Sequence, residues 1–238
     1  MARAVNGTIG TKSAASPSWL HRLTGDINGV FMSIAVVAGV LFALLTMLVV
    51  IHPAPFFFDR PIEVAVQSVN ARPFAWFNTF VSAFAGLVGV GVGAAVIVLT
   101  FLLRRPATPF VIFSAIYSVL YNVVNIIIQR PRPAGVAHTT SNLMGYSYPS
   151  GHAGFFLWLS VLAMVLLARR LPRPLYVACW VLAVALVVAA GISRIYVGAH
   201  WPSDVVGGLL VGLAWICLSL SLGRLTKPIF ESRRTGAK

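Results

Sequence analysis

Six long apolar runs constrain the fold of this chain more than any other feature of its sequence. A helix needs about 20 residues to cross a bilayer, where it satisfies its own backbone hydrogen bonds. The runs show no polar face at helical period, which argues against a soluble helical core. We therefore predict an all-α polytopic membrane protein with six transmembrane helices in a bundle, at residues 29–51, 76–103, 107–128, 151–168, 175–192 and 203–222.

The amino-acid composition indicates the same class of protein. Hydrophobic residues make up 58% of the chain and charged residues only 10%, which is far outside the range of soluble domains. A net charge of +13 would suggest a nucleic-acid partner if the basic residues formed one patch. Most of them instead lie in alternate connections between the runs or in the two terminal segments. The positive-inside rule assigns these parts to the cytoplasm, so we expect no nucleic-acid partner. These residues are Arg3, Lys12, Arg22, Arg104, Arg105, Arg169, Arg170, Arg173, Arg224, Lys227, Arg233, Arg234 and Lys238.

Three parts of the chain follow from this topology. We predict a flexible cytoplasmic tail at residues 1–28, the membrane domain at 29–222 and a basic cytoplasmic tail at 223–238. The first apolar run is too long for the core of a signal peptide, so we expect it to remain as the first span. The segment 52–73 is too short and polar to span, and we predict an external interfacial segment with a short helix. The sequence leaves the oligomeric state open.

Small residues inside the runs predict close helix contacts. Gly89 and Gly93 form one small-xxx-small pair, and Gly208–Gly212 forms another. Such pairs let two helix backbones approach each other in a membrane. The two cysteines lie inside apolar runs without metal-ligand spacing, and we interpret both as free core residues.

A polar cluster at residues 193–204 separates the last two apolar runs. Pro202 suits the first position of a helix, and Asp204 then lies in the first turn, where the helix dipole favours a carboxylate. From there Asp204 is expected to accept a hydrogen bond from His200, which leaves the other ring nitrogen free to attack a substrate. Arg194 offers a cationic fork for an anionic group.

Two further polar clusters lie on the same predicted outer side. One ends the third run at residues 125–133, and the other opens the fourth run at 149–152. Ser150 is a suitable N-cap, Gly151 lets a ligand approach the backbone, and His152 adjoins the free N–H groups of that helix start. The three clusters together predict a site for a phosphoryl group.

Two of these clusters match the motifs of a known family. Pro-Ser-Gly-His at 149–152 resembles the second signature of the type 2 phosphatidic acid phosphatase (PAP2) superfamily. Ser193-Arg194, followed after five residues by His200 and after three more by Asp204, resembles the third signature. The two signatures together are highly specific, and they imply a membrane lipid phosphatase.

The first signature of this family, a lysine six residues before an Arg-Pro pair, is only partly present. Arg132-Pro133 fits it, whereas Asn125 occupies the position of the lysine. The resemblance as a whole covers residues 55–222.

The resemblance implies a role for each matched residue. His200 would be the nucleophile and form a phosphohistidine, with Asp204 orienting it and His152 acting as the general acid. No metal and no cofactor would be required. The residues that would bind the phosphate oxygens are Arg132, Arg194, Ser150 and the N–H group of Gly151, with Asn125 at the lysine position.

The exchange of lysine for Asn125 predicts slower hydrolysis. A cation about 4 Å from a phosphate oxygen contributes roughly 4 kcal/mol at an effective dielectric near 20, whereas an amide hydrogen bond contributes about 1 kcal/mol. The difference corresponds to a rate loss on the order of a hundredfold. Arg130 either supplies the missing charge or points at lipid headgroups, and the sequence leaves both interpretations open.

The residues and the resemblance together predict a hydrolase of the cell membrane. We expect it to remove a terminal phosphate from a lipid phosphate or an isoprenoid diphosphate at the outer face, with both termini in the cytoplasm. The alternatives are a lipid-phosphate-binding protein and a phosphotransferase with attenuated hydrolysis. The segments 133–148 and 52–73 should shape the headgroup pocket, but neither identifies the lipid. A transporter is disfavoured because the polar residues gather at one face instead of the midplane.

Overall fold

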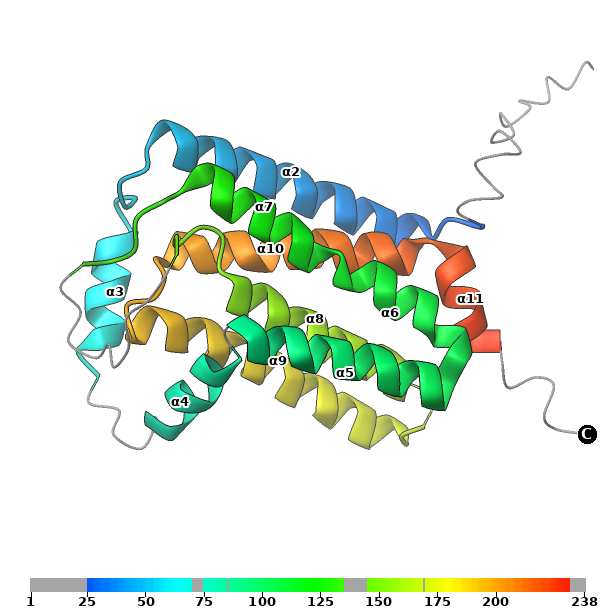
Figure 1. Cartoon of the computed structure of the whole chain (residues 1–238). Coiled ribbons are helices and arrows are strands. Elements are labelled where there is room, and N and C mark those ends of the chain that lie inside the picture. The colour runs from blue at the N-terminus through cyan, green and yellow to red at the C-terminus, as the bar shows by residue number, and fades with distance from the viewer. Residues whose placement is uncertain (1–24, 70–74, 85, 135–144, 169, 232–238) are drawn as a thin grey trace, which may run out of the picture.

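A computed structural model describes residues 25–69, 75–84, 86–134, 145–168 and 170–231. This part of the chain is all-α, with helices side by side in one bundle and a single isolated bridge between Ile27 and Leu222 (Figure 1). The elements are α2 (Gly29–Ile51), α3 (Asp59–Gln67), α4 (Ala75–Ala83), α5 (Gly86–Arg104), the 3-10 turn η2 (Arg105–Ala107), α6 (Thr108–Ala115), α7 (Tyr117–Ile128), α8 (Gly151–Leu167), α9 (Arg173–Tyr196), α10 (Pro202–Ser221) and α11 (Gly223–Glu231).

Four helical stretches of the described chain are long and apolar enough to cross a membrane, compared with the six predicted spans. They are Gly29–Ile51, Val88–Ile128, Arg173–Tyr196 and Pro202–Ser221, and Gly151–Leu167 is a shorter apolar helix. The stretch Val88–Ile128 reverses its direction at η2 (Figure 1). Proline lacks the backbone N–H that a continuing helix needs, and Pro106 lies at this reversal.

The prediction of one continuous span at residues 76–103 is wrong. The chain forms the short helix α4 and then the separate helix α5. Gly89 accommodates the break, because a Cβ atom there would lie 2.5 Å from the carbonyl oxygen of Phe84. The break leaves α4 at an angle to α5 at the end of the bundle (Figure 1).

The described residues that flank the predicted membrane domain belong to ordered structure. The Asn28 side chain caps α2 by accepting a hydrogen bond from the Phe31 N–H at 3.3 Å. The first nine residues of the predicted C-terminal tail form α11, whose Ile229 is buried against the core. Residues 1–24 and 232–238 lie outside the described chain.

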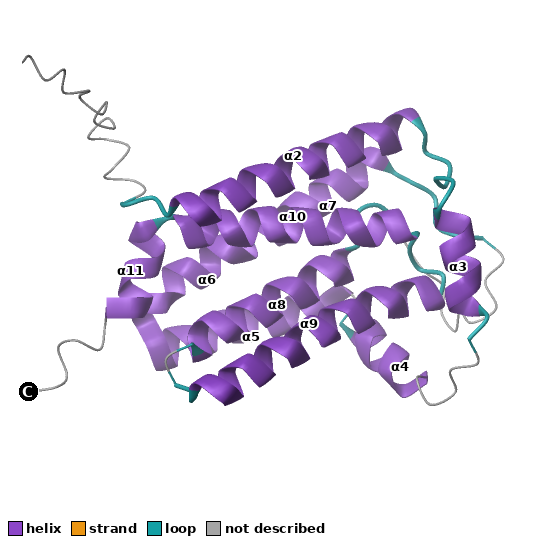
Figure 2. Cartoon of the chain, turned by 180° about the vertical axis from the view of Figure 1, so that it is seen from behind, coloured by secondary structure: helices purple, strands orange, loops and turns teal. Residues whose placement is uncertain are grey.

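The connections gather at two ends of the bundle. One end carries α3 together with the connections before α8 and before α10, and the opposite end carries η2, the α8–α9 connection and α11 (Figure 1). Seen from behind, α3 again lies across its end of the bundle (Figure 2). The three predicted polar clusters therefore share one end.

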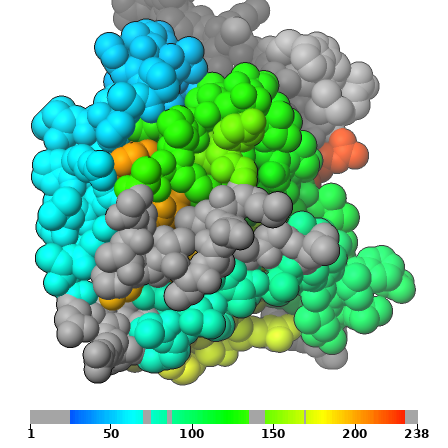
Figure 3. All heavy atoms as spheres, turned by 60° about the vertical axis from the view of Figure 1, so that its left-hand side comes forward, coloured from blue at the N-terminus to red at the C-terminus, as the bar shows by residue number. Residues whose placement is uncertain are grey.

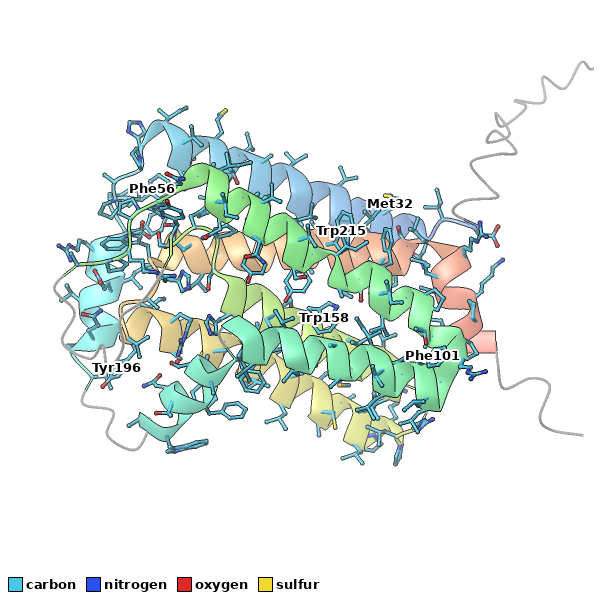
Figure 4. The ribbon with its side chains drawn as sticks, in the orientation of Figure 1. Met32, Phe56, Phe101, Trp158, Tyr196 and Trp215 are labelled. Carbon is cyan, nitrogen blue, oxygen red and sulfur yellow. The ribbon has the colours of Figure 1, made fainter. Side chains whose placement is uncertain are left out.

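The core between the two ends is apolar and contains few hydrogen bonds between helices. Trp158 of α8 lies inside the bundle (Figure 4) and is 2% exposed. Its indole N–H donates to the Ser114 hydroxyl of α6 at 2.9 Å. Phe110, Leu162 and Ile216 pack in the same cluster. Both cysteines are free, as predicted.

The two glycine pairs have different surroundings. A Cβ atom at Gly208 would lie 2.2 Å from the Ser150 carbonyl oxygen, and one at Gly212 would lie 3.3 Å from the Gly154 Cα atom. This pair therefore allows the close contact of α10 with α8 that the sequence predicted. The prediction for Gly89–Gly93 is wrong, because Gly89 faces its own chain and Gly93 has nothing within 4 Å.

We predict that Gly208→Ala destabilises the protein by about 1–3 kcal/mol, because the added methyl group overlaps a backbone carbonyl. The thermal unfolding midpoint of the purified protein in detergent measures this effect. Gly93→Ala is the matched control, and it should leave the midpoint unchanged or raise it, since alanine favours a helix by up to about 1 kcal/mol over glycine. Equal effects of the two substitutions would contradict the predicted contact.

Candidate active site

Backbone hydrogen bonds join the three polar clusters at the end of the bundle that carries α3. The Ser147 N–H donates to the Arg130 carbonyl at 2.9 Å, and the Ser150 N–H donates to the Asp204 carbonyl at 2.9 Å. The Trp201 indole donates to the Pro131 carbonyl at 3.1 Å. The segments after α7, before α8 and before α10 are therefore held side by side. Figure 3 shows this end of the molecule, with α3 in cyan beside the end of α2 in blue.

His200 lies in the short turn between α9 and α10. The N–H groups of Ala199 and His200 donate to the Arg194 carbonyl, and Gly198 takes a positive φ of 64° that glycine adopts without strain. The Nδ1 atom of His200 lies 2.6 Å from the Ser147 carbonyl oxygen. A carbonyl only accepts hydrogen bonds, so Nδ1 carries the hydrogen and Nε2 keeps its lone pair. This tautomer suits a nucleophile.

The predicted hydrogen bond between His200 and Asp204 is replaced by this contact with the backbone. The Asp204 carboxylate instead accepts from the Trp201 N–H at 2.8 Å, which caps the start of α10. It also accepts from the Arg130 Nη1 atom at 2.6 Å. Because Asp204 lies in the first turn of its helix, its carboxylate turns back onto the helix start. Asp204 therefore fixes the helix that follows His200, and Ser147 orients the ring.

Both interpretations of Arg130 are wrong. Its side chain is fully buried, so it does not point at lipid headgroups, and its guanidinium binds two carboxylates within the protein. One is Asp204, and the other is Asp59 of α3, whose Oδ2 atom lies 3.1 Å from Nη2. Nη1 also donates to the Ser203 hydroxyl at 2.7 Å. The charge of Arg130 is thus taken up by Asp59 and Asp204, which explains why it does not replace the missing lysine.

The other two arginines lie beside the histidine pair. Arg132 is partly exposed and donates to the carbonyl oxygens of Ala199 and Gly145. Arg194 is 2% exposed and donates to the Asn78 carbonyl at 3.2 Å and to the Ser82 hydroxyl at 2.9 Å. These two partners belong to α4. The break between α4 and α5 therefore brings α4 into contact with Arg194.

The rings of His152 and His200 lie close together. Their ring centroids are 6.4 Å apart, and the rings are inclined by 63°. Two ionisable rings at this separation can act on the same bound group. Within the described chain, Nε2 of His152 and Nε of Arg194 are buried and have no hydrogen-bond partner.

The surroundings of His200 keep its ring neutral. Burial lowers the pKa of His200 well below its usual value, and the nearby Arg132 guanidinium lowers that pKa further. The pKa of Arg132 is itself lowered by burial, an effect that Asp204 opposes. A neutral imidazole is the form that attacks phosphorus. The environment therefore keeps the His200 imidazole neutral into the acid range.

The start of α8 agrees with the predicted N-cap and gives Gly151 a packing role besides the predicted one. Ser150 is the N-cap of this helix, as predicted, and its hydroxyl accepts from the Ala153 N–H at 3.4 Å. Gly151 was expected to let a ligand approach the backbone. In the structure, a Cβ atom at Gly151 would lie 2.7 Å from the Tyr121 ring, so the glycine makes room for an aromatic side chain of α7.

Asn125 holds the segment that orients His200. Its side-chain nitrogen donates to the carbonyl oxygens of Tyr146 at 3.1 Å and Tyr148 at 2.9 Å. Ser147, whose carbonyl contacts the His200 ring, lies between these two residues. Both hydrogens of the amide are therefore engaged by the backbone. Asn125, which occupies the lysine position of the motif, therefore holds this loop in place.

Several residues that build this site were not predicted from the sequence. Asp59 is one of only five acidic residues in the chain, and a carboxylate next to three phenylalanines was a signal of an internal partner. Asn78 and Ser82 gave no signal, because they lie inside an apolar run. Ser147 acts through its backbone carbonyl, which any residue would supply. Among the described residues, no three His, Cys, Asp or Glu side chains gather as metal ligands.

Comparisons with known proteins agree with this arrangement. The model of the PAP2 superfamily matches residues 106–226. An undecaprenyl-diphosphatase of Sulfolobus acidocaldarius is 38% identical over 117 residues, which cover 48% of this chain and 52% of that protein. Phosphatidylglycerophosphatase B of Escherichia coli K12 is 36% identical over 96 residues, which cover 37% of this chain and 35% of that protein. The matched part thus spans about half of the first relative and a third of the second.

A solved structure shares the fold. The crystal structure of a transmembrane PAP2-type phosphatidylglycerolphosphate phosphatase from Bacillus subtilis superimposes with a TM-score of 0.65 at 20% identity, over 79% of this chain and 94% of that chain. The superfamily model covers just over half of the present chain and includes all three polar clusters. On this ground, the chain belongs to the PAP2 superfamily.

Proposed function

We propose that this protein is an integral membrane phosphatase that removes the terminal phosphate of a lipid phosphate or an isoprenoid diphosphate. The observation that carries the proposal is the pair His152 and His200, whose ring centroids are 6.4 Å apart beside two arginines. The curated relatives support the substrate class, because one is named for undecaprenyl diphosphate and another for phosphatidylglycerophosphate.

In the first step of the proposed reaction, Nε2 of His200 attacks phosphorus and a P–N bond forms. The P–O bond to the leaving group breaks. His152 takes up a proton together with the anionic substrate, whose charge favours the imidazolium, and gives this proton from Nε2 to the departing oxygen. Arg132 and Arg194 lie where they can bind the non-bridging oxygens, and the buried Nε of Arg194 has no partner in the described chain. Their fixed guanidinium charges would stabilise the charge of the transferred phosphoryl group.

In the second step, a water molecule attacks the phosphohistidine. His152, now neutral, takes a proton from this water as the P–O bond forms, and the P–N bond to His200 breaks. Inorganic phosphate leaves, and both rings return to their starting states. The Ser147 carbonyl accepts the Nδ1 hydrogen of His200 throughout, so the ring keeps its orientation.

We further propose that the chain crosses the membrane six times, with the site at the outer face. The reversal at η2 supports two passes from the stretch Val88–Ile128, and α8 would supply a further pass. The basic residues support the orientation, because Arg104, Arg170 and Lys227 lie at the end opposite to the histidine pair. The positive-inside rule makes that end cytoplasmic.

Asn125 favours a second candidate function, a lipid-phosphate-binding protein or phosphotransferase with attenuated hydrolysis. The chain has an amide where the family has a lysine, and both amide hydrogens are engaged by backbone carbonyls. The outer site therefore has two arginines beside its histidine pair and no lysine at this position. Product analysis with competing alcohols distinguishes transfer to an alcohol from transfer to water.

His200→Ala should lower phosphate release by at least about a thousandfold, because no other group would form the covalent intermediate. The assay uses purified protein in detergent with a metal chelator, phosphatidic acid, phosphatidylglycerophosphate and a polyprenyl diphosphate. His52→Ala is the matched control, since His52 is exposed at the same end and is expected to keep full activity. Wild-type activity in the His200 variant would exclude this nucleophile.

Arg132→Gln should move the acid limb of the kcat/KM profile to higher pH. The guanidinium lowers the pKa of His200, so its removal raises that pKa, and a higher pH is then needed to keep the free ring neutral. A pH series of kcat/KM measures the shift independently of the overall rate. Arg105→Gln removes the same charge at the opposite end and should leave the limb in place. An unmoved limb in the Arg132 variant would contradict the assigned contact.

Asn125→Ala should lower kcat by up to about thirtyfold, because the loop that holds His200 loses two hydrogen bonds of about 1 kcal/mol each. Asn122→Ala is the control, since the Asn122 side chain only donates to Ser118 within its own helix. Asn125→Lys should raise turnover several-fold, because an ammonium keeps donors for both carbonyls and adds a charge. If neither the wild type nor the lysine variant releases phosphate while phospholipid still binds, the protein is a lipid-phosphate-binding protein and not a phosphatase.

A further inference from the structure

Helix α3 has its polarity reversed relative to a helix that packs on an apolar core. Its buried residues are charged, with Asp59 fully buried and Glu63 2% exposed. Two of its large apolar residues point outward, with Ile62 42% and Val64 61% exposed, whereas Val66 packs against a small apolar cluster of the bundle. A surface helix normally presents its apolar stripe to the protein and its polar face to water. The outward face of α3 therefore requires an apolar environment outside the protein.

The inward face of α3 holds both sides of the turn that carries His200. Before this turn, the Gln67 side chain donates to the Ile195 carbonyl at 3.2 Å. After it, the Asp59 carboxylate accepts from the Ser203 N–H at 2.9 Å and from the Ser203 hydroxyl at 2.7 Å. A displacement of α3 would therefore pull on both ends of the segment from Ile195 to Ser203.

The outward face of α3 continues the apolar surface of the bundle. Val50 and Ile51 at the end of α2 are each 58% exposed, and Phe57 in the connection to α3 is 92% exposed. The helix lies across the end of the bundle in both ribbon views (Figures 1 and 2). A nine-residue helix spans only about 14 Å at 1.5 Å per residue, which is too short to cross a bilayer. A helix of this length and position fits the headgroup layer of a membrane.

One side of α3 also carries a basic side chain common at that depth. The Arg60 side chain is 60% exposed, and its guanidinium lies 5.7 Å from the centroid of the buried Trp201 ring. An arginine suits the level where apolar and aqueous layers meet, because it combines an apolar stem with a charged end. The occupant that fits the outward face is therefore a lipid layer.

We propose that α3 is a membrane-anchored strap: its apolar face lies in the outer lipid headgroup layer, and its polar face positions the turn that carries His200. The second half of this inference rests on the proposed phosphatase function, whereas the first half does not. Contact with the lipid surface then helps to hold the nucleophile in place. Residues Asp59 and Gln67 are positioning residues, since they act through Ser203 and Ile195.

The depth of α3 is tested by labelling. Cys179 and Cys217 are replaced by alanine, Val64→Cys is labelled with an environment-sensitive fluorophore, and the full chain is placed in vesicles that contain nitroxide lipids. Quenching at Val64 should be strongest with a nitroxide near the headgroup. The same label at Val181 in the middle of α9, which is 67% exposed, should be quenched most by a nitroxide deep in the chains.

Two results of the labelling overturn the proposal. Quenching at Val64 by aqueous iodide but by neither nitroxide lipid would put α3 in water. Emission that changes with the protein-to-lipid ratio, without nitroxide quenching, would mean that a second copy of the chain covers this face. Labelling does not depend on activity, so it tests the position of α3 even if no substrate is found.

The link to the nucleophile is tested by kinetics in vesicles. Val64→Asp should lower kcat by about tenfold with little change in KM, because a charged residue draws α3 out of the lipid layer. Val64→Leu keeps the apolar anchor and should retain wild-type kcat, which a general loss of packing would not allow. The unfolding midpoint in detergent verifies that the aspartate variant is folded.

The outcomes separate the two proposals. A wild-type protein that hydrolyses no lipid phosphate contradicts the proposed function. A wild-type protein that is active, together with an equally active Val64→Asp variant, contradicts the link between α3 and His200. Gln67→Ala provides a second route, because it releases the Ile195 carbonyl without changing the lipid-facing side or the buried Arg130 ion pairs, and it should also lower kcat with KM nearly unchanged.

Discussion

The guanidinium of Arg130, buried between the carboxylates of Asp59 and Asp204, is the interaction on which the active end of the molecule depends. All three side chains are fully buried, and the two ion pairs measure 3.1 and 2.6 Å. Removal of one partner from such a group typically costs 3–5 kcal/mol, roughly, because it leaves a buried charge without compensation. The three residues belong to three separate segments of the chain. Their pairing therefore fixes how α3, the loop after α7 and the start of α10 meet.

The two remaining arginines of the site act differently because their surroundings differ. Arg132 and Arg194 donate to neutral carbonyl and hydroxyl oxygens. The charge of both guanidinium groups lowers the pKa of His200. Arg130 instead has its charge neutralised by two buried carboxylates, as a buried structural arginine requires. The three arginines therefore differ in what surrounds their charge.

Backbone hydrogen bonds also hold the site together, as do close helix contacts that glycine permits because it lacks a Cβ atom. The Ser147 carbonyl orients His200, and the Asp204 carbonyl accepts from the Ser150 N–H. Gly208 lets α10 approach α8 closely enough for that second contact, since a Cβ atom there would lie 2.2 Å from the Ser150 carbonyl oxygen. The close packing of two apolar helices therefore brings the two histidine-bearing segments together.

The sequence by itself determined the membrane class, the helical starts at Ser150 and Pro202, and the grouping of His152, His200 and the arginines at one end. These features follow from local patterns: apolar length, cap chemistry and motif spacing. Only the tertiary structure decided the partner of each polar group. Arg130 binds Asp59, which lies 71 residues away in the sequence, and His200 contacts the Ser147 carbonyl oxygen instead of Asp204. Such choices depend on burial and on distances between segments, because a buried charge must be neutralised by whatever group the packing brings near it.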